Sequence, residues 1–181
     1  FSYLDDHYKA KESEVYLGFK SDYEISKSGK ILIGSEYYLI SRKDGLVEAR
    51  PRHIFKVNGG YQFFPIEDLS LTIGANVVLE NDTIGKDKSV HVYPDFRASY
   101  PLSQSVEVYA GLVGDIDKLS LHTIAHENAW VNANIAIFNT NRTIEFLGGL
   151  KGKLGSKVAF GTGFSVANLK DFYYYQNDST D

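Results

Sequence analysis

Leu-Ser-Leu-Thr-Ile-Gly-Ala-Asn-Val-Val-Leu-Glu, residues 69–80, is the stretch that decides the fold. Every odd position is apolar, and nearly all the even positions are polar or small. Successive side chains of a β-strand point to opposite faces, so a period of two predicts a strand with one dry and one wet face. A helix would need apolar residues three and four apart, which this stretch does not provide.

The same alternation continues along most of the chain and predicts eight strands. We expect them at residues 14–26, 30–42, 46–64, 69–82, 89–101, 105–115, 142–154 and 157–170. The third is long, and Gly59-Gly60 predicts a bulge or bend within it. Residues 1–13 are polar and are expected to form a loop or lead-in segment. The remainder, 14–181, is then one unit of strands and loops.

The expected strands are longer than the five or six residues usual in soluble proteins. A membrane strand needs about 9–11 tilted residues to cross the hydrocarbon, and these are long enough. The connections at 27–29, 65–68, 103–104 and 155–156 are tight, whereas 83–88 and 116–141 are long or polar. Short turns at one end and longer loops at the other are typical of outer-membrane barrels. The connection Lys43-Asp44-Gly45 is an exception to this pattern, because it falls at the end of the longer loops and is itself short.

Composition narrows the classes of function. The chain has 181 residues, no cysteine, a net charge of −4 and 14% aromatic residues. Disulfide frameworks, cysteine–metal sites and thiol nucleophiles are thereby excluded. Nothing marks a nucleic-acid footprint. No apolar run reaches the roughly 18 residues that a transmembrane helix needs.

Alternation alone does not say which face points inward. A soluble barrel buries the apolar face inside, whereas a membrane barrel turns it outward. Charges of both signs and small residues on the polar face favour a wet lumen. Aromatic residues near expected strand ends favour interfacial girdles; they are Tyr37, Tyr38, Phe63, Phe64, Tyr100 and Phe172–Tyr175. We therefore predict an all-β, antiparallel, up-and-down transmembrane β-barrel of about eight strands, complete or part of a larger barrel.

The polar face supplies the candidate lumen residues. They are Glu48, Arg50, Arg52, Lys56, His91, Asp95, Arg97, Glu107, Glu145 and Lys151. Arg50, Arg52 and Lys56 share one face of one strand. This row is either a basic stripe that selects anions or part of a ladder of ion pairs with Glu48 or with carboxylates on neighbouring strands. The ladder is the simpler interpretation.

The polar face also carries a pair of carboxylates. Asp95 and Glu107 lie on adjacent strands and have the residue types of a hydrolytic carboxylate pair. Pairing of Asp95 with Arg97 is the simpler interpretation, since no nucleophile or oxyanion donor accompanies them. We therefore expect no enzyme, no catalytic residue and no cofactor.

The longest expected loop, 116–141, carries the remaining candidates. They are His122, His126, Glu127 and Trp130. Histidines four apart on a helix can share a zinc ion. The full metalloprotease pattern is absent, however, so a polar loop explains them better and no metal is predicted. The spacing of Ile116, Leu119 and Ile124 predicts a short helix in this loop, which could constrict a pore or contact a ligand. Trp130 is either an interface anchor or a loop packing residue.

Residues 90–177 resemble the outer-membrane proteins of Bacteroidetes labelled TonB-dependent receptor or porin-like. The matching stretches are Tyr93-Pro94-Asp95, Tyr109-Ala110-Gly111-Leu112, His126–Val131 and Gly149–Leu154. The resemblance implies a barrel of many more than eight strands. The sequence departs from a TonB-dependent transporter in having no recognisable plug domain or energy-coupling box, so the resemblance does not extend to active uptake.

Three functions remain open. The first is porin-like or receptor-like passage of solutes across a bacterial outer membrane, with membrane lipid and further barrel strands or subunits as partners. The second is a structural barrel that scaffolds an outer-membrane complex. The third is a soluble β-sheet binding module.

Overall fold

The computed structural model describes residues 1–6, 9–26, 29–44, 50–82, 89–132, 135–155 and 157–176. These residues contain nine strands and one helix. The strands are β1 (Ser2–Asp5), β2 (Lys11–Ser26), β3 (Gly29–Lys43), β4 (Arg50–Phe63), β5 (Ser70–Glu80), β6 (Val90–Ser103), β7 (Val106–Asp117), β8 (Thr140–Leu154) and β9 (Val158–Lys170). The helix, α1 (Leu121–Glu127), lies between β7 and β8.

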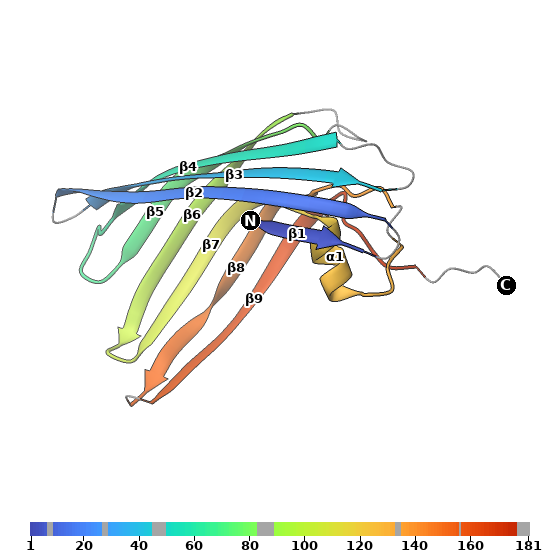
Figure 1. Cartoon of the computed structure of the whole chain (residues 1–181). Helices are drawn as coiled ribbons and strands as arrows, with labels where there is room; N and C mark the ends of the chain where they lie inside the picture. Colours follow the sequence, from blue (N-terminus) through green and yellow to red (C-terminus); the bar gives the residue numbers. More distant parts are fainter. Residues whose placement is uncertain are drawn as a thin grey trace.

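Each strand pairs with its neighbour in sequence, always antiparallel, in one sheet ordered β1 to β9. Figure 1 shows this curved sheet with α1 at the end where the chain leaves β9. The predicted all-β, antiparallel, up-and-down fold is confirmed. The sheet is not closed: β1 and β9 are its two edges within the part of the chain that the structure describes.

The expected polar lead-in, residues 1–13, differs from the structure. Ser2–Asp5 forms β1, and β2 begins at Lys11, so that Ser2 pairs with Glu14 and Asp5 with Lys11. A four-residue strand on a sheet edge is too short for alternation to reveal it, and its residues look like loop residues.

Two other expectations concern β4. Gly59-Gly60 does not form a bulge, because the ladders to β3 and β5 both run through these glycines without a shift. A Cβ on Gly74 would lie 2.6 Å from the Gly59 carbonyl oxygen. The glycines therefore permit close approach of the two backbones rather than a bend. β3 ends at Lys43 and β4 begins at Arg50. Of the tight turn expected at Lys43–Gly45, Gly45 lies outside the described residues, as do residues 46–49.

Register keeps the two predicted faces separate across the sheet. Tyr37 of β3 pairs with Phe55 of β4, and Phe55 pairs with Leu79 of β5, so apolar residues form continuous rows. Many of these side chains are exposed, Leu17 at 63%, Val92 at 67% and Val166 at 70% among them. Monomeric soluble proteins rarely leave so large an apolar surface uncovered.

The polar face is the concave face. Lys56 of β4 donates from Nζ to Oδ2 of Asp115 in β7 at 2.8 Å. Three strand spacings separate these strands along a sheet, about 14 Å if it were flat. Two side chains meet across that span only if the sheet curls toward them. The apolar rows therefore occupy the convex face.

The end of β7 leaves β6 and bends across the concave face. The β6–β7 ladder stops at Asp95–Val113, whereas β7 continues to pair with β8 as far as Asp117–Thr140, after a shift between Val113 and Asp115. Beyond the shift, Ile116 is fully buried in a cluster with Ile54 and Val78. The apolar cluster explains why these two residues interrupt the polar face of β4 and β5.

The segment between β7 and β8 continues this inward course. Residues 118–139 include α1, so the predicted short helix is confirmed. Leu119, Leu121, Ile124 and Ile137 form a second buried cluster with Ala10. No helix in the described residues has the length and apolarity to cross a membrane. The described residues of 118–139, which the sequence suggested to be a long loop, are thus packed against one end of the sheet. We call the end of the sheet where β7 ends and β8 begins the loop end.

Gly114 is the residue that permits the bend, and replacing it tests this account. A Cβ there would lie 2.8 Å from the Thr143 carbonyl oxygen and 2.8 Å from Cδ1 of Tyr93. We expect Gly114→Ala to lower the free energy of unfolding by about 1–3 kcal/mol, measured by urea denaturation in detergent. Gly59→Ala is the control, because no heavy atom lies within 4 Å of its Cβ position, and a change within about 0.5 kcal/mol is expected. Equal effects of both substitutions on the free energy of unfolding would contradict the role of Gly114 in the bend.

Candidate functional site: a polar network at the loop end

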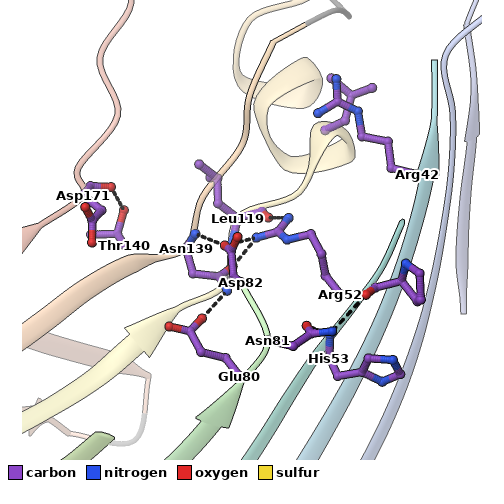
Figure 2. A network of polar contacts seen from close by, with 12 residues as sticks. Arg42, Arg52, His53, Glu80, Asn81, Asp82, Leu119, Asn139, Thr140 and Asp171 are labelled. Atoms are coloured by element: carbon purple, nitrogen blue, oxygen red, sulfur yellow. Dashed lines mark hydrogen bonds and ion pairs between the residues drawn. The ribbon is translucent and has the colours of Figure 1, made fainter. Parts of the chain in front are cut away.

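Arg52 is the centre of a hydrogen-bonded network on the concave face. Its guanidinium donates to Oδ2 of Asp82 at 2.9 Å, to Oδ1 of Asn139 at 2.7 Å and to the carbonyl of Leu119 at 2.8 Å. Figure 2 shows Arg52 pointing from its strand toward these groups. One side chain of β4 therefore joins the end of β5 to both ends of the segment 118–139.

Asn139 completes the connection. Its backbone N–H donates to Oδ2 of Asp82 at 2.9 Å, and its Nδ2 donates to Oε2 of Glu80 at 2.7 Å. Its Oδ1 also accepts from the backbone N–H of Leu119 at 3.2 Å. Asn139 is fully buried, and Glu80 and Asp82 are nearly so. Buried charges are tolerated when they are paired and hydrogen-bonded, as these are.

A second attachment comes from β3. Arg42 donates from Nη1 to the carbonyl of Ile135 at 2.8 Å and from Nη2 to Oδ2 of Asp44 at 2.6 Å. Both side chains of this ion pair are buried. The segment 118–139 is thus held near its C-terminal end by two arginines from two strands.

A third attachment fixes the start of α1. The carboxylate of Glu12 in β2 accepts from the backbone N–H groups of Leu121 and His122, both at 2.9 Å. Ser120 caps the same end by accepting from the N–H of Thr123 at 3.1 Å. The first N–H groups of a helix have no partner within the helix and carry partial positive charge, so a carboxylate there is favourable.

The residues of the predicted basic row whose side chains the structure describes form ion pairs. Arg52 pairs with Asp82 and Lys56 pairs with Asp115. Asp115 also accepts from Nδ2 of Asn76 at 2.9 Å. The backbone of Arg50 pairs with Arg42 in the β3–β4 ladder; its side chain and Glu48 lie outside the described residues. Both described cations of the row therefore have carboxylate partners, as the ion-pair interpretation predicts.

The other lumen candidates also lie on the concave face and are paired. His91 lies beside Glu80, with 3.2 Å between Nε2 and Oε1. Asp95 accepts from Arg97 at 2.6 Å, as the simpler interpretation had it. Lys151 pairs with Glu107 at 3.1 Å, and Glu145 accepts from Arg142 at 2.5 Å. Asp95 and Glu107 are thus each engaged by a cation.

The loop candidates separate into different roles. His122 contributes its backbone N–H to Glu12, and no group of three His, Asp or Glu ligands exists among the described residues. Glu127 accepts from the hydroxyls of Tyr173 at 2.6 Å and Tyr175 at 3.1 Å. The hydrogen bond to this carboxylate, with desolvation, raises the pKa of Tyr173 to about 12. His126 and Trp130 are exposed.

Sequence reasoning missed the partners that make the network. Glu12, Arg42, Asp82 and Asn139 were not singled out, because they lie far apart in sequence and at strand ends. One signal was available: acidic and basic residues recur where each strand reaches the loop end. The pattern indicates a charged rim but does not reveal which residues pair.

Comparisons with known proteins agree with this fold. No family model matches the chain, and no curated protein matches it. Among solved structures, it is similar to the siderophore receptor PirA from Pseudomonas aeruginosa, with a TM-score of 0.60 and 13% identity. The match covers 90% of this chain and 32% of that chain. At this identity the likeness shows the fold alone: a run of up-and-down antiparallel strands like part of that receptor.

Removal of Arg52 tests the network. Arg52→Ala would leave buried Asp82 without its cation, and we expect a loss of about 3–5 kcal/mol in the free energy of unfolding. Hydrogen exchange at residues 118–139 should accelerate more than exchange in the strands. Arg97→Ala is the matched control, since the Arg97 side chain is 64% exposed and its pair contributes roughly 0–1 kcal/mol. Exchange at 118–139 unchanged in Arg52→Ala would show that the network does not hold this segment.

Proposed function

We propose that this chain is part of an outer-membrane β-barrel that binds a solute and lets it pass. The observation that carries the proposal is the polarity of the sheet, with exposed apolar rows on the convex face and paired charges on the concave face. A soluble barrel has the reverse arrangement. A lipid-facing exterior with a polar interior is the arrangement of membrane barrels. The similarity to a siderophore receptor supports a receptor-like role.

The two free edges support a barrel larger than nine strands. β1 covers only Lys11–Glu14 of β2, and the outer edge of β9 has no partner among the described strands. Unpaired backbone groups in hydrocarbon cost several kcal/mol each, so a membrane sheet must close. In the proposal, further strands of the whole protein or of another subunit complete the barrel.

The segment 118–139 has a defined place in such a barrel. It lies against the concave face at the loop end, attached to β2, β3, β4 and β5 by Glu12, Arg42, Arg52 and Asn139. Closed into a barrel, the same segment would narrow the lumen. We propose that it controls passage, and we assign the chain no catalytic activity.

A scaffold function is the second candidate. The ion pairs Arg52–Asp82 and Lys56–Asp115 fill part of the concave face. A lumen packed with paired charges suits a barrel that docks other components better than it suits an open pore. A soluble module is less well supported, because the exposed apolar rows on the convex face would then need a cover.

The barrel itself is tested on the intact protein made with its native leader. We expect it to require detergent and to run faster on an SDS gel unboiled than boiled, because a closed barrel resists unfolding by the detergent. The boiled sample is the control for chain length. A monodisperse protein without detergent and with no mobility shift would refute the membrane proposal and favour the soluble module.

Conductance across planar bilayers distinguishes passage from scaffold. If the segment 118–139 narrows a pore, Arg52→Ala should raise the conductance several-fold, and Arg97→Ala should change it little. Arg52→Lys keeps the positive charge and should give an intermediate value. If the wild-type protein and Arg52→Ala both show the boiling shift but neither conducts, the result would support the scaffold function.

A further inference from the structure

One carboxylate on the concave face contacts both an amine and a carboxamide. Oδ2 of Asp115 accepts from Nζ of Lys56 at 2.8 Å, and Oδ1 accepts from Nδ2 of Asn76 at 2.9 Å. A neutral amine is a nucleophile, and the carbonyl carbon of a carboxamide is an electrophile. Asp115 therefore holds the two partners of an acyl-transfer reaction with one acid–base group between them.

Lys56 and Asn76 come from adjacent strands and share the concave face. In the β4–β5 ladder Lys56 pairs with Val78, and Asn58 pairs with Asn76. Lys56 and Asn76 are therefore diagonal neighbours, which lie about 7–8 Å apart in an antiparallel pair. The flexible four-carbon stem of lysine covers this separation, so Nζ of Lys56 can reach Cγ of Asn76 without movement of the backbone.

Water has little access to the amine of Lys56. Its side chain is 12% exposed, and its Nζ also donates to the carbonyl of Ile116 at 2.6 Å. Val78, opposite Lys56, and Ile116 are both fully buried. Burial penalises separated charges, so a buried ion pair can pass to its neutral form by proton transfer along the hydrogen bond. Transfer from Nζ of Lys56 to Asp115 frees the amine for attack.

The three side chains also line one cavity, of about 390 Å³. This cavity gives a small leaving molecule a way out of the site. Asn58 lines it too, but no hydrogen bond joins Asn58 to Asp115 within the described part of the chain. The carboxylate thus selects Asn76 over the neighbouring asparagine.

We propose that Lys56 and Asn76 join in an intramolecular isopeptide bond, with Asp115 as the catalytic carboxylate. A C–N bond forms between Nζ of Lys56 and Cγ of Asn76, and the bond between Cγ and Nδ2 of Asn76 breaks. Asp115 takes a proton from Nζ at its Oδ2 and delivers one to Nδ2, its contact at Oδ1, so that ammonia leaves. Of the three protons on the Lys56 ammonium, one stays on the new amide and two depart with the ammonia as ammonium.

The bond ties β4 to β5 beside the point where β7 bends inward. It goes beyond the proposed function and does not depend on it, because it needs only three side chains brought together by the folded sheet. The reaction consumes no cofactor, oxidant or second substrate.

Mass spectrometry of the intact protein tests the bond. We expect the folded protein, purified in detergent, to be lighter than its sequence by the mass of one ammonia, about 17 Da. Trypsin should no longer cleave after Lys56, so that residues 53–86 appear as one peptide with the same mass loss. Protein recovered in urea and never refolded should show neither change, because unfolding separates the three groups.

Three substitutions remove one partner each. Lys56→Arg keeps the positive charge but not the amine, Asn76→Ala removes the acyl group and Asp115→Ala removes the proton carrier. Each should abolish the mass loss and restore cleavage after residue 56. Asn58→Ala is the matched control, because Asn58 lines the same cavity opposite Asn76 and its removal should leave both changes in place. The control also excludes ring closure at Asn58-Gly59, which releases ammonia without joining two strands.

The wild-type mass decides the inference even where a variant does not fold. Loss of ammonia together with the uncut peptide supports the bond, as does the absence of both in the three variants. A wild-type mass equal to that of the sequence, after prolonged incubation of the folded protein, would overturn it. A mass loss that persists in Lys56→Arg, or disappears in Asn58→Ala, would also overturn it. Circular dichroism reports separately whether each variant is folded.

Discussion

The guanidinium of Arg52 is the interaction on which the loop end depends. It reaches the strand end after β5, the start of the inward segment and the end of that segment at the same time. Without it, Asp82 and Asn139 would keep their burial but lose their common donor. A cation with three acceptors from three parts of the chain fixes geometry more strictly than apolar packing, because each hydrogen bond has a preferred direction.

The fold could be predicted because two physical rules act locally. Alternation in residues 69–80 reports which side of a strand is dry, and the rule holds whether the dry side faces protein or lipid. Tight turns such as Ser103-Gln104 then force neighbours in sequence to pair. The helix at Leu121–Glu127 was expected within this loop, although Ile116 and Leu119, two of the three residues behind the expectation, lie before it. β1 was missed because four residues on an edge carry too little pattern.

The candidate site could be predicted only in part. The polar faces of β4 and β6 were evident, and with them Arg52, Lys56, His91 and Arg97. Their partners were not, since Lys56 meets Asp115 through the curl of the sheet together with the inward bend of β7 at Gly114. That bend requires a glycine among crowded neighbours, and sequence alternation does not report crowding. Arg42 and Ile135, 93 residues apart, are likewise joined only by the curvature of the sheet.

The order of pairing has a consequence for the way the molecule is made. Every strand pairs with the one before it, so the sheet can grow in the order in which the chain is synthesised. Glu12, Arg42, Arg52 and Asp82 all precede residue 118, so the side chains that hold the inward segment come from strands earlier in the chain. Asn139 lies immediately before β8 begins, and β8 pairs with β7 around the segment that lies between them in the chain. Sequential pairing therefore lets an inward segment be inserted between two neighbouring strands without changing the order of the sheet.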